Sequence, residues 1–406
     1  MSQLAERSTY RDVFAVAEFR ALWLAQVLSV GGDQLARVAL TVLVYNQTRS
    51  SLLAAVTFVC SIVPSFFGGL ILSGLADRLP RRTVMIACDM IRGVLVLIMV
   101  VPGMPLAALI VLLFVVTLVS APFQSARSAI VPDVLPGEAY VLGTAVTMTT
   151  LLLTQFVGFA VGGLVVGAFG VRTSLVVDAA TYAASAMLVR WWVRKRPAAH
   201  PKAPQAAQDP GRTWRSELAA GIRLVLGNPA LRTPMLFGWL AAFYDAPEGV
   251  AAPLAHALHG GSKTVGLLLA AAALGAGLGA VSFSRLVDPA RRMRWTPPLS
   301  IACCAALILL ALRPPLAVTL LVLLLSGLLS CYQTGANAAF VIAVPPEQRG
   351  QAFGLAQGGI NLGQGVVMIL AGAAAGRFAP AIVIAVIGAL GALAATAVTL
   401  SVPRHS

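Results

Sequence analysis

Charged residues are scarce along the whole chain. Asp, Glu, Lys and Arg together supply only 11% of the 406 residues, whereas a soluble domain carries roughly 25%. Apolar residues reach 58%, and they recur in runs of about 20, the length that crosses a bilayer as a helix. This composition excludes a soluble globular enzyme, a disordered chain and a coiled coil, and it predicts a polytopic membrane protein.

The sequence also lacks the patterns on which cofactor-dependent enzymes rely. Its five cysteines all lie in apolar runs, without the spacing of metal ligands. It contains no G-x-x-x-x-G-K-S/T loop to hold the phosphates of ATP, and no pairing of a nucleophile with a base is evident. We therefore expect a protein that is not an enzyme and has no cofactor, metal site or catalytic residue.

Lysine is rare, with three residues among 29 basic ones, although the net charge is +14. Most basic residues fall in short gaps between apolar runs, where membrane topology places them, so we expect no binding to nucleic acid. Alternate gaps hold 22 and five Lys or Arg residues, which predicts that both termini are cytoplasmic. The Arg- and Ala-rich composition indicates a GC-rich genome, and we expect a bacterial cytoplasmic membrane.

Twelve apolar segments can be distinguished. Each is long enough to cross the roughly 30 Å hydrocarbon core as a helix, and helices are expected because lipid cannot satisfy open backbone groups. The pattern predicts an all-α integral membrane protein with twelve transmembrane helices. The expected spans are 20–44, 52–75, 84–101, 105–125, 139–168, 172–193, 231–256, 264–286, 296–312, 315–342, 351–376 and 379–401.

The longest polar stretch divides these segments six and six. We expect an N-terminal six-helix bundle over 1–193, a cytoplasmic linker over 194–230 and a C-terminal six-helix bundle over 231–406. The linker carries apolar residues at helical spacing, which predicts an amphipathic helix that either lies on the membrane surface or simply connects the bundles. These residues are Trp214, Leu218, Ile222 and Val225.

The two halves are related by an offset of 209 residues. Residues 123–129 (F-Q-S-A-R-S-A) resemble residues 332–338 (Y-Q-T-G-A-N-A), and the same offset aligns Gln155 with Gln364. Parallel six-helix repeats, with a substrate site near the bilayer midplane, are the plan of many secondary transporters. The repeat therefore predicts two pseudo-symmetric bundles.

The loop after the second span carries a recognisable signature. Residues 73–82 read S-G-L-A-D-R-L-P-R-R, which resembles the G-x-L-A-D-R-x-G-R-K loop of the major facilitator superfamily, with Ser and Pro at the two Gly positions. The resemblance implies the major facilitator fold, a transport function and a loop that latches the inner gate. Asp77 could pair with Arg127 or face the N-terminus of span eleven. The expected gating residues are Asp77, Arg78, Arg81, Asp89, Arg92 and Arg127.

A narrower resemblance covers most of the first half. Residues 32–33 (G-D), 89–92 (D-x-x-R) and 126–129 (A-R-S-A) are similar to the macrolide-efflux type of drug:proton antiporters. Residues 158–163 (G-F-A-V-G-G) resemble the antiporter motif G-P-x-x-G-G, with Phe159 in place of Pro. The resemblance implies drug:proton antiport, and members of that group export macrolides, other antibiotics and siderophores.

Ionisable residues inside a membrane span are candidates for function because a charge there costs about 2.5–3.5 kcal/mol on insertion scales. Asp33 lies near the middle of the first span, with Arg37 four residues on and on the same helix face. Either Asp33 gains and loses the coupling proton while Arg37 adjusts its proton affinity, or the two form a permanent ion pair.

A second pair of candidates lies in span seven. The spacing of Asp245 and Glu248 places two carboxylates on one helix face, where each disfavours ionisation of the other. The pair could carry a proton or bind a cationic drug, or it could lie in water near the outer end of the span.

Polar and aromatic side chains inside the spans could line a cavity for a bulky amphipathic substrate. Hydrogen bonding between helices and aromatic packing explain individual members equally well. Asp178 in span six is expected to make a helix-packing hydrogen bond rather than to serve transport. The cavity candidates are Gln34, Gln155, Phe159, Trp239, Phe243, Tyr244 and Gln364.

These features together predict a secondary active transporter. The expected function is proton-coupled efflux of amphipathic small molecules of the drug or antibiotic class by alternating access, as in multidrug resistance. The expected partners are the small-molecule substrate, protons and the lipid bilayer, and the protein is expected to act as a monomer. A siderophore exporter, a nutrient importer and a lipid transporter of the same fold are the alternatives.

Overall fold

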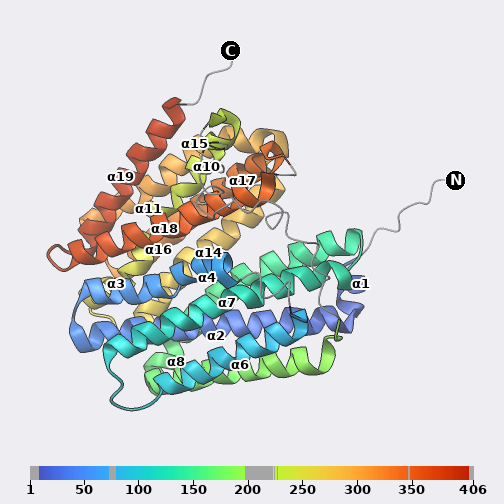
Figure 1. Cartoon of the computed structure of the whole chain (residues 1–406). Helices are drawn as coiled ribbons and strands as arrows, with labels where there is room; N and C mark the ends of the chain where they lie inside the picture. The colour runs from blue at the N-terminus through green and yellow to red at the C-terminus, as the bar shows by residue number, and fades with distance from the viewer. Residues whose placement is uncertain are drawn as a thin grey trace. The chain divides into compact units, whose positions relative to one another are not determined.

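The computed structural model describes residues 9–72, 79–196, 223, 225, 227–345 and 348–401. Within these residues the chain is helical and contains no strand (Figure 1). The all-α prediction is therefore confirmed. The signature residues 73–78, which include Asp77 and Arg78, lie outside the described residues, as does nearly all of the predicted linker helix.

Contacts along the chain separate two compact units. The first unit comprises residues 1–39 and 64–202, and the second comprises 40–63 and 203–406. The long helix α2 (Ala17–Thr48) thus contributes its first part to one unit and its last turns to the other. The second span is divided as well, between α3 (Ser51–Cys60) and α4 (Val63–Leu72).

The first unit is built from long helices that lie side by side (Figure 1). Phe19, Leu22, Met85, Phe123 and Val189 contribute to its hydrophobic core, and each of these side chains is almost fully buried. Besides α2 and α4, the helices are α1 (Tyr10–Ala15), α6 (Arg81–Met99), α7 (Leu106–Val134) and α8 (Glu138–Trp192).

Helix α8 contains a break at Gly170, where the backbone adopts φ 82° and ψ 172°. Positive φ is readily available to glycine because it lacks a Cβ. The break falls between the predicted spans 139–168 and 172–193, so both of these segments are helical and Gly170 separates them.

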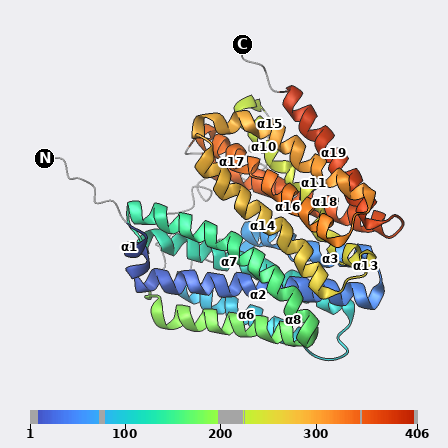
Figure 2. The same cartoon turned by 180° about the vertical axis from the view of Figure 1, so that it is seen from behind.

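The second unit holds the remaining helices, among which α14 and α16 run side by side (Figure 2). Gly275, Gly279 and Gly327 permit this approach, because an added Cβ at any of them would overlap backbone of the facing helix. Besides α3, the elements are α10 (Pro229–Trp239), α11 (Ala241–Tyr244), α12 (Ala246–Gly249), α13 (Ala251–Ala257), α14 (Ser262–Leu286), α15 (Pro289–Ala306), a 3-10 helix (Leu307–Leu312), α16 (Leu316–Leu329), α17 (Tyr332–Ala343), α18 (Arg349–Ala375) and α19 (Pro380–Ser401).

The seventh predicted segment, 231–256, is a series of short helices rather than one continuous helix. Pro247 is the second residue of α12, and proline cannot donate the backbone hydrogen bond that a continuous helix needs. At the junctions the backbone hydrogen bonds span three residues instead of four. One of them runs from the Glu248 amide to the Asp245 carbonyl, at 3.0 Å.

Nine helices in the described part of the chain are long and apolar enough to cross a membrane. Many large apolar side chains are also exposed, including Leu286, Leu312 and Ile342, as expected for surfaces that face lipid rather than water. The chain is therefore a multi-pass membrane protein. The count of twelve crossings and the cytoplasmic placement of both termini stay predictions.

Candidate functional site

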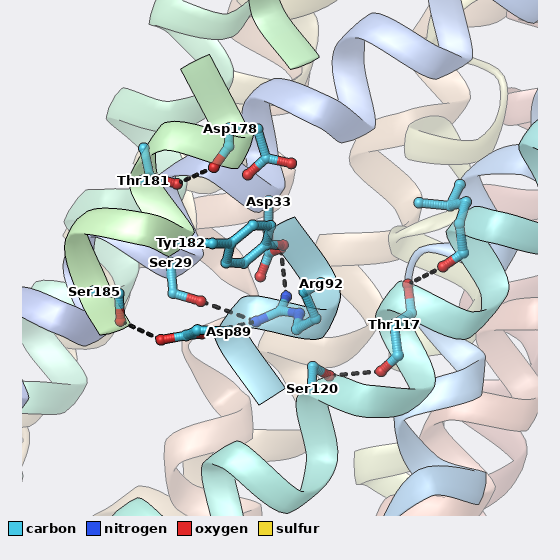
Figure 3. Close-up of polar contacts among 11 residues, drawn as sticks. Ser29, Asp33, Asp89, Arg92, Thr117, Ser120, Asp178, Thr181, Tyr182 and Ser185 are labelled. Carbon is cyan, nitrogen blue, oxygen red and sulfur yellow. Dashed lines mark hydrogen bonds and ion pairs between the residues drawn. The ribbon is translucent and has the colours of Figure 1, made fainter. Parts of the chain in front are cut away.

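A charged network occupies the middle of the first unit. Asp33 in α2 accepts a hydrogen bond from Arg92 in α6, with 2.6 Å between Oδ1 and the guanidinium nitrogen Nη2 (Figure 3). The hydroxyl of Tyr182 in α8 donates to the same oxygen. Three helices that are far apart in the sequence are therefore joined at one carboxylate.

Arg92 is the buried centre of this network, with only 2% of its surface exposed. Its second terminal nitrogen donates to the Ser29 hydroxyl at 3.0 Å and lies 4.0 Å from a carboxylate oxygen of Asp89. The guanidinium also lies over the ring of Tyr182, 4.3 Å from its centroid, a favourable cation–π contact. Partners from α2, α6 and α8 thus compensate a charge that lipid could not.

Two further acids flank this centre. Asp89 is fully buried and accepts a hydrogen bond from the Ser185 hydroxyl at 2.5 Å. Asp178 is also fully buried, and the hydroxyl of Thr181 donates to its backbone carbonyl rather than to its carboxyl, at 2.7 Å (Figure 3).

The local sequence explains why these side chains meet. Helical residues three or four apart share a face, and the network uses that spacing on each helix. On α8, Asp178, Tyr182 and Ser185 are separated by four and three positions. Ser29 with Asp33 and Asp89 with Arg92 show the same spacing on α2 and α6.

The ion pair found at Asp33 joins two helices. Asp33 pairs with Arg92 from another helix, and Arg37 places its guanidinium carbon 6.0 Å from the centroid of the Phe159 ring. Helices α6 and α8 present Arg92 and Tyr182 directly to Asp33, which the spacing along one helix could not reveal.

The expected gating cluster is divided in the structure. Asp89 and Arg92 belong to the network around Asp33. Arg81 instead pairs with Asp133 at 3.1 Å and donates to the Ala129 carbonyl at 2.8 Å, joining α6 to α7. Arg127 is buried, with a guanidinium nitrogen 3.4 Å from the Thr147 hydroxyl.

The cavity candidates of the first unit lie where α8 meets α2. Phe159 is fully buried and Gln34 is 5% exposed, whereas Gln155 is partly exposed. A Cβ added at Gly158 would contact the Gln34 side chain closely. Gln34 and Phe159 therefore contribute to helix packing at this contact.

Three of the cavity and proton candidates in the broken segment of the second unit form hydrogen bonds to neighbouring helices. Gln364 in α18 donates to the carboxylate of Asp245 at 2.6 Å, and Gln333 in α17 donates to the Tyr244 hydroxyl at 3.1 Å. Trp239 donates its indole N–H to the Ala356 carbonyl at 3.1 Å. Phe243 and Glu248 are both partly buried in the same broken segment.

Comparison with known proteins identifies the family. The sequence profile of the Major Facilitator Superfamily matches residues 22–312 and 246–406. The chain belongs to the major facilitator superfamily. Transport as the activity of this chain is a proposal.

Relatives with curated descriptions point in the same direction. The enterobactin exporter EntS of Shigella boydii serotype 4 is 27% identical over 277 residues, covering 67% of this chain and 64% of the relative. EntS of Escherichia coli O139:H28 is 26% identical over the same length. Because the match spans less than two thirds of either relative, it supports the family without giving this chain their substrate.

Solved structures confirm the major facilitator fold. A POT family transporter in complex with a thioalcohol-conjugated peptide gives a TM-score of 0.76 at 10% identity, covering 95% of this chain and 96% of that one. The nucleoside transporter NupG gives 0.65 at 17% identity, covering 94% and 98%. At such low identity the likeness shows the fold alone.

Tyr182, Ser29 and Ser185 were not predicted as members of the site. Ser29 and Tyr182 each lie four residues from an acid within a span, and this spacing was the available signal. Ser185 lies seven residues, or two helical turns, after Asp178. Neither Tyr nor Ser is rare in transmembrane helices, so the spacing alone could not separate them from ordinary packing residues.

Proposed function

We propose that this transporter is a proton-coupled exporter of amphipathic small molecules that works by alternating access. The observation that carries the proposal is the ion pair between Asp33 and Arg92, held by Tyr182 inside the membrane-spanning helices. Such charges are costly in an apolar core and are retained where they serve transport.

Asp33 is the member of this network suited to exchange a proton. Its side chain is 28% exposed, whereas that of Arg92 is 3% exposed. Proton binding to Asp33 would remove the charge that Arg92 pairs with and leave Asp89, 4.0 Å away, as its remaining carboxylate. The proton would then change the relative stability of two arrangements of α2, α6 and α8, as coupling requires.

The organisation proposed for this function follows the sequence. Two six-helix bundles over 1–193 and 231–406 would be joined by a cytoplasmic linker over 194–230, in a monomer with both termini in the cytoplasm. Asp245 and Glu248 are the second proton-coupling candidates. The inner gate would use Asp77 and Arg78, together with Arg81 and Arg127.

The substrate class has two candidates. The resemblance in the first half favours a drug or antibiotic, in which case the protein would confer resistance. The match to enterobactin exporters favours a siderophore. Drugs and siderophores are both amphipathic organic molecules, and in both cases the proposed activity is export. The same transport assay can therefore be run with each class and shows which one is the substrate.

The test is substrate-induced collapse of a preformed pH gradient in inverted membrane vesicles. The panel would contain macrolides, tetracyclines, dyes and siderophores. We expect collapse with a few compounds of one class, and loss of that response in Asp33→Asn. Asp288→Asn is the matched control, because it removes the same charge from an exposed position in the second unit.

The outcome with each class is decisive. A response confined to siderophores would select the siderophore exporter and reject drug efflux. A normal response in Asp33→Asn would remove Asp33 from the coupling mechanism. Absence of any response, with insertion verified, would contradict proton-coupled export and favour a nutrient importer or a lipid transporter.

A further inference from the structure

The carboxyl group of Asp178 is buried without the partners that a charge requires. Asp178 is fully buried, and neither of its carboxyl oxygens accepts a hydrogen bond from any residue that the structure describes. The hydroxyl of Thr181 uses its one proton on the backbone carbonyl of Asp178. The acid therefore differs from Asp33 and Asp89, which both accept hydrogen bonds.

The nearby donors and the nearby cation are directed elsewhere. The two terminal nitrogens of Arg92 are directed to Asp33 and Ser29, and the hydroxyl of Tyr182 donates to Asp33. Asp89, on α6, lies beside Arg92 rather than beside Asp178 (Figure 3). The charged groups that interact with Asp178 are Asp33 from α2 and Arg92 from α6.

Electrostatics then selects the protonation state of Asp178. Asp33 and Asp89 already place two carboxylates around one guanidinium. An ionised Asp178 would bear a large desolvation cost and the repulsion of Asp33, and these outweigh the attraction of Arg92 and the neighbouring Thr181 side chain. A neutral carboxylic acid avoids both costs, and its O–H can donate to a neighbouring oxygen.

The packing holds this acid against the helix that carries Asp33. A Cβ added at Gly32 would overlap a carboxyl oxygen of Asp178 and the hydroxyl of Thr181. The carboxyl group therefore lies on the backbone of α2 at the residue that immediately precedes Asp33. Any displacement of α2 along α8 changes the surroundings of Asp33 and Asp178 together.

We propose that Asp178 is a second proton site of this transporter, which holds a proton in this conformation while Asp33 is ionised. This inference rests on the proposed proton-coupled function and extends it to a pair of acids. The transfer moves one proton from the carboxyl of Asp178 to the carboxylate of Asp33, so one O–H bond breaks and one forms. Because Asp178 is fully buried and Asp33 is partly exposed, Asp33 is the route by which Asp178 exchanges its proton with water.

The first test is infrared spectroscopy of the purified full-length protein in liposomes, without substrate. A protonated carboxyl gives a C=O stretching band that shifts in heavy water. Other acids can contribute to this band, so we expect one component of it to be lost in Asp178→Asn and the same component to be retained in Asp89→Asn. Asp89 is the matched control because it is equally buried but accepts a hydrogen bond from Ser185.

Retention of the full band in Asp178→Asn, or loss of the same component in Asp89→Asn, would overturn the proposal. If Asp178→Asn does not fold, Asp178→Glu decides: that component must move in frequency, and an unchanged band would contradict the assignment. This measurement needs no substrate, so it stands whether or not vesicles respond to the compounds in the panel.

The second test separates a proton site from a structural role. In Asp178→Asn we expect substrate–substrate exchange to continue while its dependence on pH becomes at least several-fold weaker. Asp178→Glu should restore the dependence. A variant that exchanges substrate with the unmodified pH profile would show that Asp178 serves packing alone.

Discussion

At the scale of single residues, Arg92 is the cation that allows the first unit to bury acidic side chains. The residue supplies the positive charge for two acids, Asp33 at 2.6 Å and Asp89 at 4.0 Å. Breaking a buried ion pair by removing one partner costs more than the pair contributes, because the other charge is left uncompensated. Arg92 is therefore the position at which stability and proton coupling are most closely linked.

Arg92→Gln should destabilise the protein by about 3–5 kcal/mol, because it removes the cation that pairs with Asp33 and lies beside Asp89. Unfolding of the purified protein in mixed detergent measures the change. The double variant Asp33→Asn with Arg92→Gln should recover part of the loss. If the double variant is no more stable than the single one, the ion pair is not the cause.

A second residue-scale prediction concerns the second unit. Gln364→Met removes the hydrogen bond to the part-buried Asp245, and loss of a hydrogen bond to such an acid costs roughly 1–3 kcal/mol. Gln357→Met on the same helix is the control, because Gln357 is exposed and bonds only locally to Asn361. Equal unfolding transitions for the two variants would argue against a stabilising role of the Gln364–Asp245 contact.

At the scale of elements, two devices shape the helices that carry the site. Close packing at glycine brings α2 against the second part of α8, with Gly32 beneath Asp178 and Thr181. Interruption by proline and short turns divides the segment that carries Asp245 into α10 to α13. At such breaks, backbone N–H and C=O groups lose their hydrogen bonds within the helix. Broken helices are tolerated in the protein interior because other groups there can bond to these N–H and C=O groups.

Gly32→Ala should separate α2 from α8 and lower both stability and transport. Overpacking of this kind costs typically about 1–3 kcal/mol, and proton-driven export should fall because Asp178 and Asp33 are displaced together. Gly69→Ala in α4 is the matched control, since open space surrounds that position and Ala is the better helix former. Comparable losses in both variants would contradict a specific contact at Gly32.

At the scale of the whole molecule, the two compact units are not simply the parts of the chain before and after the linker. The boundary between them falls at residues 202 and 203, within the predicted linker, yet residues 40–63 are grouped with the second unit. The last turns of α2 and all of α3 therefore belong with helices from the other half of the chain. The chain has the major facilitator fold.

The predicted topology can be checked with reporter fusions at both termini and in the gaps between spans. A fluorescent reporter folds in the cytoplasm and a secreted phosphatase is active only outside it. We expect cytoplasmic signals at both termini, because the basic residues are concentrated on that side. A phosphatase signal at either terminus would contradict an even number of crossings with cytoplasmic ends.

Several features were determined by the sequence alone. The scarcity of charge and the recurrence of apolar runs predicted an all-α membrane protein, because lipid admits few other arrangements of backbone. The loop at 73–82 indicated the superfamily although the structure does not describe residues 73–78. Such features are encoded locally, in composition and in short motifs.

Only the tertiary structure decided which charges meet. Asp33 was recognised as a site residue, but its partner Arg92 lies 59 positions away and Tyr182 lies 149 positions away. Asp178 was read as a packing residue, and only its burial without a donor distinguishes it from Asp89. Helical spacing fixes the neighbours on one helix, whereas the contacts that set the charge state of an acid come from other helices.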